Sequence, residues 1–228
     1  MKSKIRSSFM ASIPVLMGYI VLGIAFGMLL SSQGYPIYYA LLMSVFIYAG
    51  SMQFVTINLL TSGASLVSSA LMTLFVNARH LVYGLSMLDR FKDMGKYKPY
   101  MIFSLTDETY SLLVADKDAD KETMFFISLF NQCYWIIGSL IGSAIGHLIS
   151  INTTGLDFAM TALFVVIVVD QFLNSDKHIY TCIGFIVSIG CLLIFGSTSF
   201  IIPSMIGILI SLIIMYKKPT INKSSKNL

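Results

Sequence analysis

The stretch IPVLMGYIVLGIAFGMLL, residues 13–30, decides the fold class because it contains no charged side chain. It lies within a longer run, residues 7–78, that is free of Asp, Glu, Lys and Arg, and residues 123–156 and 178–216 are further runs of this kind. A helix needs about 20 apolar residues to cross a bilayer core of roughly 30 Å. Each run is therefore long enough for one or more membrane-spanning helices.

The composition agrees with lipid as the surrounding solvent. Of the 228 residues, 56% are hydrophobic and only 11% are charged, whereas soluble domains carry about 25% charged residues. The apolar runs are continuous and do not alternate with polar residues, which favours a helical bundle over a barrel of strands. We predict an all-α, polytopic transmembrane helical bundle.

Polar breaks that contain glycine, proline or charged residues divide the chain into about eight apolar segments, which predict seven to eight spans. Residues 1–216 are expected to form one transmembrane transporter domain, and residues 217–228 a basic polar tail. The eight segments are residues 9–31, 37–60, 65–88, 100–115, 124–149, 157–173, 179–196 and 200–216.

Positive charge conflicts with a simple topology of full spans. Basic residues cluster before the first segment, in the 90–98 loop and at Lys217 and Lys218, and such clusters favour the cytoplasmic side. Three full spans between the first two clusters would place them on opposite sides, and five full spans between the last two clusters would do the same. Either one loop breaks the charge rule, or a segment in each half is broken or re-entrant.

A weak internal repeat accompanies this pattern. The motif GxxxG at 23–27 recurs at 142–146, and VF followed by QF at 45–54 recurs as LF followed by QF at 163–172. Transporters are commonly built from two repeats, with the substrate site where the halves meet. The alternative is a chance match in sequence rich in glycine and phenylalanine. The predicted repeats are about residues 9–88 and 124–206.

The segment IYAGSMQFVTIN, residues 47–58, carries polar groups where lipid offers no partner. Gly50 weakens the helix, and a helix broken there would expose backbone groups able to bind carboxylates or cations. In the alternative interpretation, small residues let two helices approach and the polar side chains bond across that interface. The first interpretation makes four residues candidates for substrate binding: Tyr48, Gly50, Ser51 and Gln53.

Arg79 lies in the middle of FVNARHLVYG, residues 75–84. A charged group at the centre of a span costs roughly 2.5–3.5 kcal/mol, so Arg79 is expected to face a cavity or an acidic partner. Asn77 and His80 fall near the same helix face, which makes all three candidates for substrate binding. Alternatively, the segment is shifted and Arg79 reaches the headgroup layer. A break at Asn77 would place Arg79 at the mouth of a half-helix.

Two adjacent carboxylates, Asp107 and Glu108, interrupt another apolar segment. Repulsion and burial favour the protonated form of one of them, which suits proton coupling, and Asp107 is also the leading partner for Arg79. In the alternative, Thr106 or Asp107 caps a half-helix and Glu108 reaches water. Asp170, in FVVIVVDQF, is a further candidate for proton coupling or an ion pair, or it marks the membrane interface.

Other function classes lack their motifs. The chain has no nucleotide-binding loop and no HExxH zinc motif, and Cys133, Cys182 and Cys191 show no CxxC spacing. We therefore expect no enzyme activity, no cofactor and no metal site. The basic residues fall in short clusters beside apolar runs, which is typical of membrane topology signals and not of nucleic-acid binding.

Four motifs occur in a fixed order: GIAFG (23–27), YAGSMQF (48–54), ARHLVYG (78–84) and LTDE (105–108). On these motifs, the chain resembles the AzlC-like family, the large subunit of branched-chain amino acid exporters. The resemblance implies a multi-pass protein of the bacterial plasma membrane. It also implies export of leucine, isoleucine and valine together with a small AzlD-like membrane subunit.

The expected function is secondary transport, namely export of branched-chain and other hydrophobic amino acids coupled to the proton gradient. The backbone near Gly50, with Ser51 and Gln53, would bind the charged ends of the amino acid. In an apolar binding site, one methylene changes the binding free energy of a side chain by only about 1–3 kcal/mol. Broad substrate acceptance is therefore expected. The alternatives are a non-transporting membrane scaffold or assembly subunit, and an intramembrane enzyme.

Overall fold

The computed structural model describes residues 2–116, 118–148, 165, 168–169, 172–173 and 178–217. The chain divides into two compact units, Met1–Phe164 (unit 1) and Val165–Leu228 (unit 2). The described residues form apolar helices and turns without any strand, which confirms the all-α, polytopic membrane fold. The single transporter domain with two repeats stays a prediction.

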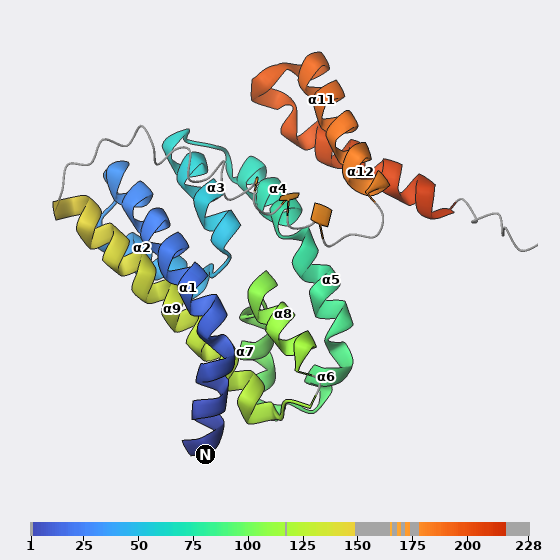
Figure 1. The fold of residues 1–228 in the computed structure, drawn as a ribbon. Coiled ribbons are helices and arrows are strands. Elements are labelled where there is room, and N and C mark those ends of the chain that lie inside the picture. The colour runs from blue at the N-terminus through green and yellow to red at the C-terminus, as the bar shows by residue number, and fades with distance from the viewer. Residues whose placement is uncertain are drawn as a thin grey trace, which may run out of the picture. The chain divides into compact units, whose positions relative to one another are not determined.

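The helices of unit 1 range from two long ones to several half-helices (Figure 1). Stretches long and apolar enough to cross a membrane are Lys4–Ser32, Lys121–Leu148 and, in unit 2, Ile179–Gly196. The elements of unit 1 are α1 (Lys2–Ser32), α2 (Ile37–Phe46), α3 (Gly50–Thr61), α4 (Leu66–Val76), α5 (Ala78–Ser86), α6 (Leu88–Lys92), the 3-10 turn η1 (Gly95–Tyr97), α7 (Lys98–Phe103), α8 (Asp107–Ala115) and α9 (Lys121–Leu148). Unit 2 contains α11 (Ile179–Ser199) and α12 (Ile201–Lys217).

The half-helices arise because three predicted segments are interrupted in the middle. Segment 37–60 gives α2 and α3, with residues 47–49 outside both helices. Segment 65–88 gives α4 and α5, which meet at Asn77. Segment 100–115 gives α7 and α8, which are separated by residues 104–106. Thr106 caps α8, since its side chain accepts a hydrogen bond from the backbone N–H of Thr109.

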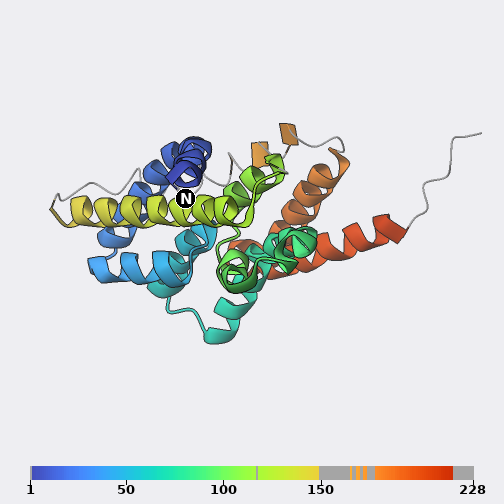
Figure 2. The same cartoon turned by 90° about the horizontal axis from the view of Figure 1, so that it is seen from below.

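The long helices α1 and α9 lie side by side with their backbones in direct contact (Figures 1 and 2). A Cβ atom on Gly27 would lie 2.1 Å from the carbonyl oxygen of Ser139, and one on Gly142 would lie 2.1 Å from that of Ile24. Such a close approach needs residues without side chains at the crossing. The two GxxxG motifs of the sequence therefore lie on helices that pack against each other.

The surface of unit 1 has the character expected in lipid. Met17 and Val21 on α1 and Leu66 on α4 are exposed to 67%, 65% and 89%. Polar side chains of the long helices are instead buried within the bundle, as Ser12 of α1 and Asn131 of α9 are both 0% exposed. Apolar groups outside and bonded polar groups inside suit a bilayer, which offers no partners for hydrogen bonds.

The helices α2 and α3 form a hairpin whose tip lies against the middle of α9. Gln132 Nε2 donates a hydrogen bond to the carbonyl oxygen of Val45, at 3.3 Å. Trp135 Nε1 donates to Gln53 Oε1, at 2.8 Å. The end of α2 and the start of α3 therefore contact the same turn of α9.

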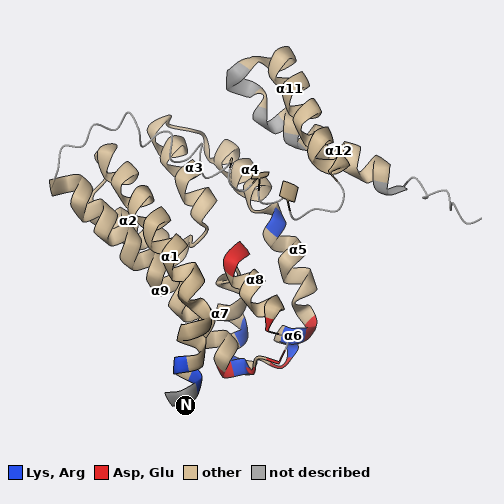
Figure 3. Cartoon of the chain, viewed as in Figure 1, with Lys and Arg blue, Asp and Glu red and all other residues tan. Residues whose placement is uncertain are grey.

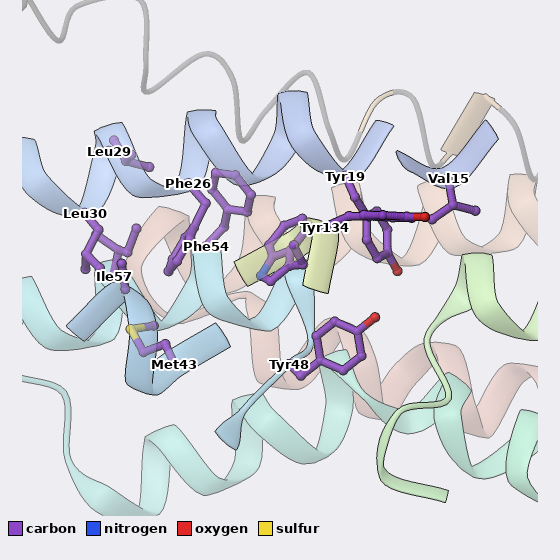
Figure 4. Packing of buried hydrophobic residues seen from close by; sticks show 12 residues of the cluster. Val15, Tyr19, Phe26, Leu29, Leu30, Met43, Tyr48, Phe54, Ile57 and Tyr134 are labelled. Carbon is purple, nitrogen blue, oxygen red and sulfur yellow. The ribbon is translucent and has the colours of Figure 1, made fainter. Parts of the chain in front are cut away.

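Beyond this tip, α3 returns along α1 toward the end at which α2 begins. Phe54 packs edge-on against Phe26, with ring centroids 5.7 Å apart. Farther along, Ile57 lies beside Leu30 in the apolar core (Figure 4). The segment 37–60 is therefore re-entrant, because it enters the bundle and leaves at the same end.

The helices α7 and α8 form a second hairpin, which enters from the opposite end. At the inner side, Tyr100 Oη of α7 donates to Gln132 Oε1 at 2.7 Å. At the outer side, Arg90 of α6 donates to the carbonyl oxygens at the end of α8, those of Leu113 and Asp116. The two hairpins thus approach each other near the middle of α9.

Charged side chains gather at one end of unit 1 (Figure 3). There, Lys4 of α1 forms ion pairs with Asp120 and Glu122 at the start of α9, and the 90–98 loop lies at the same end. Both basic clusters can therefore face the cytoplasm, as the charge rule requires. The re-entrant path of α2 and α3 removes the conflict between the N-terminal cluster and the 90–98 loop. The starts of α5 and α8 are also charged but lie away from this end.

The ion pair between Lys4 and Asp120 makes the stability of unit 1 depend on pH. The side-chain hydrogen bond from Lys4 lowers the pKa of Asp120 from 3.8 to about 2. The folded protein binds this proton more weakly than the unfolded chain, so the stabilisation is present above pH 3.8 and is lost as the pH falls toward 2. We expect the thermal midpoint in detergent to fall over this window, and the fall to be shallower in Lys4→Gln. Equal pH profiles for both proteins would contradict the assignment.

In unit 2, α11 is interrupted at Gly196, whose φ is +72°. Glycine adopts this left-handed conformation at little cost, whereas other residues do so rarely. The helices α11 and α12 pack against each other, and a Cβ on Gly207 would lie 2.8 Å from Val187 Cγ1. Asp170 lies outside the described residues, as does all of the basic tail except Lys217.

Candidate functional site

Three interruptions of the helices meet at Arg79, in the first turn of α5. Its Nη1 lies 2.7 Å from Oδ2 of Asp107, in the first turn of α8. Its Nη2 donates a hydrogen bond of 2.6 Å to Oγ of Ser51, in the first turn of α3. Each helix N-terminus carries about half a positive charge on its unpaired N–H groups. The convergence of three such ends produces a region of positive potential around one ion pair.

The pair between Arg79 and Asp107 is accessible and only partly satisfied. The two side chains are exposed to 23% and 30%. Arg79 Nε, Asp107 Oδ1 and the nearby Asn77 Oδ1 are buried atoms that have no hydrogen-bond partner among the described residues. A buried polar atom without a partner costs roughly 1–3 kcal/mol. Arg79 Nε and Asn77 Oδ1 are therefore left as a donor and an acceptor without a partner, while the Tyr83 hydroxyl lies close to Asp107.

Glu108 belongs to a second network. Tyr19 Oη of α1 donates to Glu108 Oε2 at 2.7 Å and also lies 2.7 Å from Thr106 Oγ1. Thr106 Oγ1 donates to Thr109 Oγ1 at 2.9 Å, and Asn131 Nδ2 of α9 donates to the same hydroxyl at 3.0 Å. This network ties the start of α8 to both long helices.

Tyr48 lies in the break between α2 and α3. Its φ of +40° is unusual for a residue with a side chain, and such a conformation costs of order 1–3 kcal/mol. Its side chain is only 3% exposed. The hydroxyl points toward Tyr19 (Figure 4) and lies close to the hydroxyls of Tyr19 and Thr109. The strained backbone thus holds the Tyr48 hydroxyl at the edge of the Glu108 network.

Gln53 and Gly50 attach the start of α3 to α9. Gln53 is 0% exposed, and its amide accepts from Trp135 Nε1 and donates to Ser44 Oγ, at 2.8 and 3.3 Å. A Cβ on Gly50 would lie 3.0 Å from the Trp135 ring, so only a very small residue fits there. These contacts position Ser51 in front of Arg79. Direct contact of Gly50 and Gln53 with a substrate stays a prediction.

His80 and Asn77 lie at the junction of α4 and α5. His80 Nδ1 is 3.3 Å from the carbonyl oxygen of Asn77, and the imidazole packs edge-on against Tyr83 with ring centroids 6.0 Å apart. The break at Asn77 places Arg79 at the start of a half-helix, which is one of the alternatives that the sequence predicted. The roles of Asn77 and His80 in binding stay predictions.

Sequence reasoning missed four residues of these networks: Tyr19, Thr109, Asn131 and Trp135. Asn131 and Trp135 are four residues apart in a charge-free run, so they lie on one face of a helix. A polar residue and the single tryptophan on a shared helix face were therefore a usable signal. Tyr19 carried no comparable signal, because a tyrosine in an apolar helix is ordinary.

The two networks supply guanidinium, hydroxyl, amide and carboxylate groups, but no metal site. No group of three or more His, Cys, Asp and Glu side chains suited to a metal ion occurs among the described residues. A donor-rich region at Arg79 lies next to an acceptor-rich region at Glu108, since Asp107 and Glu108 are consecutive residues of α8. This arrangement can bind a small molecule that carries both charges.

Known proteins resemble the chain over most of its length. The AzlC protein family model matches residues 14–149, which include every residue of both networks. The branched-chain amino acid transport protein AzlC of Bacillus subtilis is 42% identical over 216 residues, which cover 93% of this chain and 85% of that protein. An uncharacterized membrane protein of Helicobacter pylori is 42% identical over 217 residues, 93% of this chain and 95% of its own length.

A more distant relative, the inner membrane protein YgaZ of Escherichia coli, is 30% identical over 142 residues, 59% of this chain and 58% of that protein. No solved structure matches the chain. The family match and the apolar helices together indicate a transport protein of the bacterial plasma membrane. The chain belongs to the AzlC family.

Proposed function

We propose that this protein exports branched-chain and related hydrophobic amino acids, coupled to the proton gradient and together with a small AzlD-like membrane subunit. The observation that carries the proposal is the meeting of three half-helix starts at the accessible pair of Arg79 and Asp107. The Bacillus subtilis relative is named a branched-chain amino acid transport protein. The export direction and the small subunit follow from the resemblance to exporter subunits.

In this proposal, the carboxylate of the amino acid binds at Arg79. Arg79 Nε is an unused donor, and the helix ends at Ser51 and Asp107 favour an anion through their unpaired N–H groups. Asn77 and His80 border the same place. The apolar side chain of the substrate lies against the surrounding apolar residues, which separate similar side chains weakly.

The two re-entrant hairpins provide the alternating access that a transporter requires. The hairpin of α2 and α3 enters from one end, the hairpin of α7 and α8 enters from the other, and each forms a hydrogen bond with Gln132. Movement of one hairpin would open the site to one side of the membrane while the other stays closed. Asp107 or Glu108, at the tip of the second hairpin, carries the coupling proton.

Efflux of radiolabelled leucine from preloaded cells tests this proposal. We expect efflux to be fastest in cells that express the chain with its small partner subunit, and to slow when a protonophore collapses the proton gradient. Expression levels are matched by quantifying the protein in membrane fractions. If the complete pair gives no more efflux than empty-vector cells, the protein is a scaffold or assembly subunit instead.

A further inference from the structure

We propose that Glu108, Tyr48 and Asn131 form a subsite for the ammonium group of the transported amino acid. The proposal rests on the proposed function, since it assigns one part of the transport site. It separates the two charged ends of the substrate, with the carboxylate at Arg79 and the ammonium group at Glu108.

Two buried oxygen atoms in the hydrogen-bonded network around Glu108 can accept a hydrogen bond from a ligand. Asn131 is 0% exposed, and because its Nδ2 donates to Thr109 Oγ1 at 3.0 Å, its Oδ1 is left unpaired. The Tyr48 side chain is 3% exposed, and its hydroxyl lies close to the hydroxyls of Tyr19 and Thr109. An amide oxygen can only accept a hydrogen bond, and a hydroxyl oxygen can also accept one. Asn131 Oδ1 therefore requires a donor that the described part of the chain does not supply, and Tyr48 Oη can accept a further hydrogen bond.

Glu108 supplies the negative charge of the subsite. Tyr19 Oη donates to its Oε2 at 2.7 Å, which holds the carboxylate in one orientation. An ammonium group has three N–H donors, and Glu108, Tyr48 and Asn131 provide three acceptors. A primary ammonium is thus a cation that has one donor for each of these acceptors.

The neighbouring carboxylate, that of Asp107, already has a cationic partner in the protein. Asp107 Oδ2 lies 2.7 Å from Arg79 Nη1, so its charge is compensated within the protein. Successive residues of a helix point about 100° apart, so Asp107 and Glu108 face different neighbours although they are adjacent in sequence. Asp107 pairs with the guanidinium of Arg79, and Glu108 is available to bind a cation. The ammonium and carboxylate of an amino acid share one carbon atom, which matches two subsites at adjacent positions of α8.

Binding at Glu108 also gives a reason for proton exchange. A protonated Glu108 carries no charge to attract the ammonium, so the amino acid binds as the carboxyl proton leaves to water on the same side of the membrane. The titratable or charged groups that face Glu108 are Tyr19 on α1, Tyr48 between α2 and α3, Arg79 on α5 and Asp107 on α8. Exchange of one proton for one ammonium moves the two in opposite directions, as proton-driven export needs.

Competition by leucine analogues tests the subsite. Purified protein and its small partner are reconstituted in liposomes, and counterflow of radiolabelled leucine is measured with two inhibitors. The first, 4-methylpentanoate, lacks the ammonium group, and the second, 3-methylbutylamine, lacks the carboxylate. In the wild type, unlabelled leucine should inhibit at least about tenfold better than either analogue, because each analogue lacks a charged hydrogen-bonding group.

In Glu108→Gln, we expect the advantage of leucine over 4-methylpentanoate to fall at least about tenfold, while its advantage over 3-methylbutylamine is retained. Arg79→Gln should show the reverse. Ratios within one variant do not depend on the amount of folded protein, and the exposed Glu122→Gln serves as the matched control.

Equal changes toward both analogues in Glu108→Gln, or no change toward either, would overturn the assignment while leaving the proposed function intact. Absence of leucine counterflow in the wild-type complex would overturn the proposed function itself, and this subsite with it. Asn131→Leu should shift the ratios in the same direction as Glu108→Gln.

Discussion

Replacing Arg79 with glutamine is expected to reduce leucine efflux by roughly 10- to 150-fold. A hydrogen bond to a charged group is worth roughly 1.5–3 kcal/mol, and each 1.4 kcal/mol corresponds to about tenfold. Arg79 makes one such bond to Asp107 and is the proposed partner of the substrate carboxylate. The initial rate of efflux, divided by the amount of folded protein in the membrane, measures the effect.

The control for this prediction separates structure from transport. Arg79→Gln leaves Asp107 without its partner, whereas Arg79→Gln combined with Asp107→Asn removes both charges together and should recover much of the lost thermal stability. Efflux should stay low in the double variant, because the carboxylate has no cation to bind. If efflux in Arg79→Gln remains within about twofold of the wild type, the carboxylate site is not at Arg79.

Alanine at Gly27 or Gly142 is expected to produce the largest loss of stability among single substitutions in unit 1. The new Cβ atom would lie 2.1 Å from a backbone oxygen of the facing helix in both cases. Backbone cannot move aside as a flexible side chain can, so α1 and α9 must separate. Overpacking a well-packed contact costs typically 1–3 kcal/mol, occasionally more. The thermal midpoint in detergent and the yield of monodisperse protein measure the loss.

The same helix offers a matched control. A Cβ on Gly18 of α1 would meet nothing within 4 Å, so Gly18→Ala should be neutral or slightly stabilising, since alanine favours helix more than glycine does. Equal midpoints for Gly18→Ala and Gly27→Ala would show that α1 and α9 do not pack closely in the membrane.

The fold class and the ion pair were accessible from the sequence for clear physical reasons. Long charge-free runs leave only membrane helices as an outcome. A lone arginine in such a run needs a compensating partner, and Asp107 is one of the few carboxylates in the apolar segments. The position of Arg79 at a half-helix start also followed from an alternative that placed a break at Asn77.

The path of the segment 37–60 could not be predicted in the same way. A re-entrant hairpin and a full span have similar lengths and apolar character, so local composition does not separate them. Gly50 was interpreted as the weak point of one helix, but it begins α3 and lies where Trp135 leaves no room for a larger side chain. The turn itself is made by residues 47–49, with Tyr48 in the left-handed region.

The Glu108 network could not be predicted from the sequence for another reason. Its members come from α1, α8 and α9, and the bond between Tyr19 and Glu108 joins residues 89 positions apart. Contacts of this separation depend on how α1 and α9 pack, which a single sequence does not specify. Only the spacing of Asn131 and Trp135 carried local information.

Equilibrium binding of radiolabelled leucine to the purified protein with its small partner tests most directly the claim that the amino acid binds where the half-helices meet at Arg79. We predict saturable binding to the wild type. We predict none to the folded variant that combines Arg79→Gln with Asp107→Asn, with folding verified by its thermal midpoint. Saturable binding of unchanged affinity to this double variant would contradict the claim.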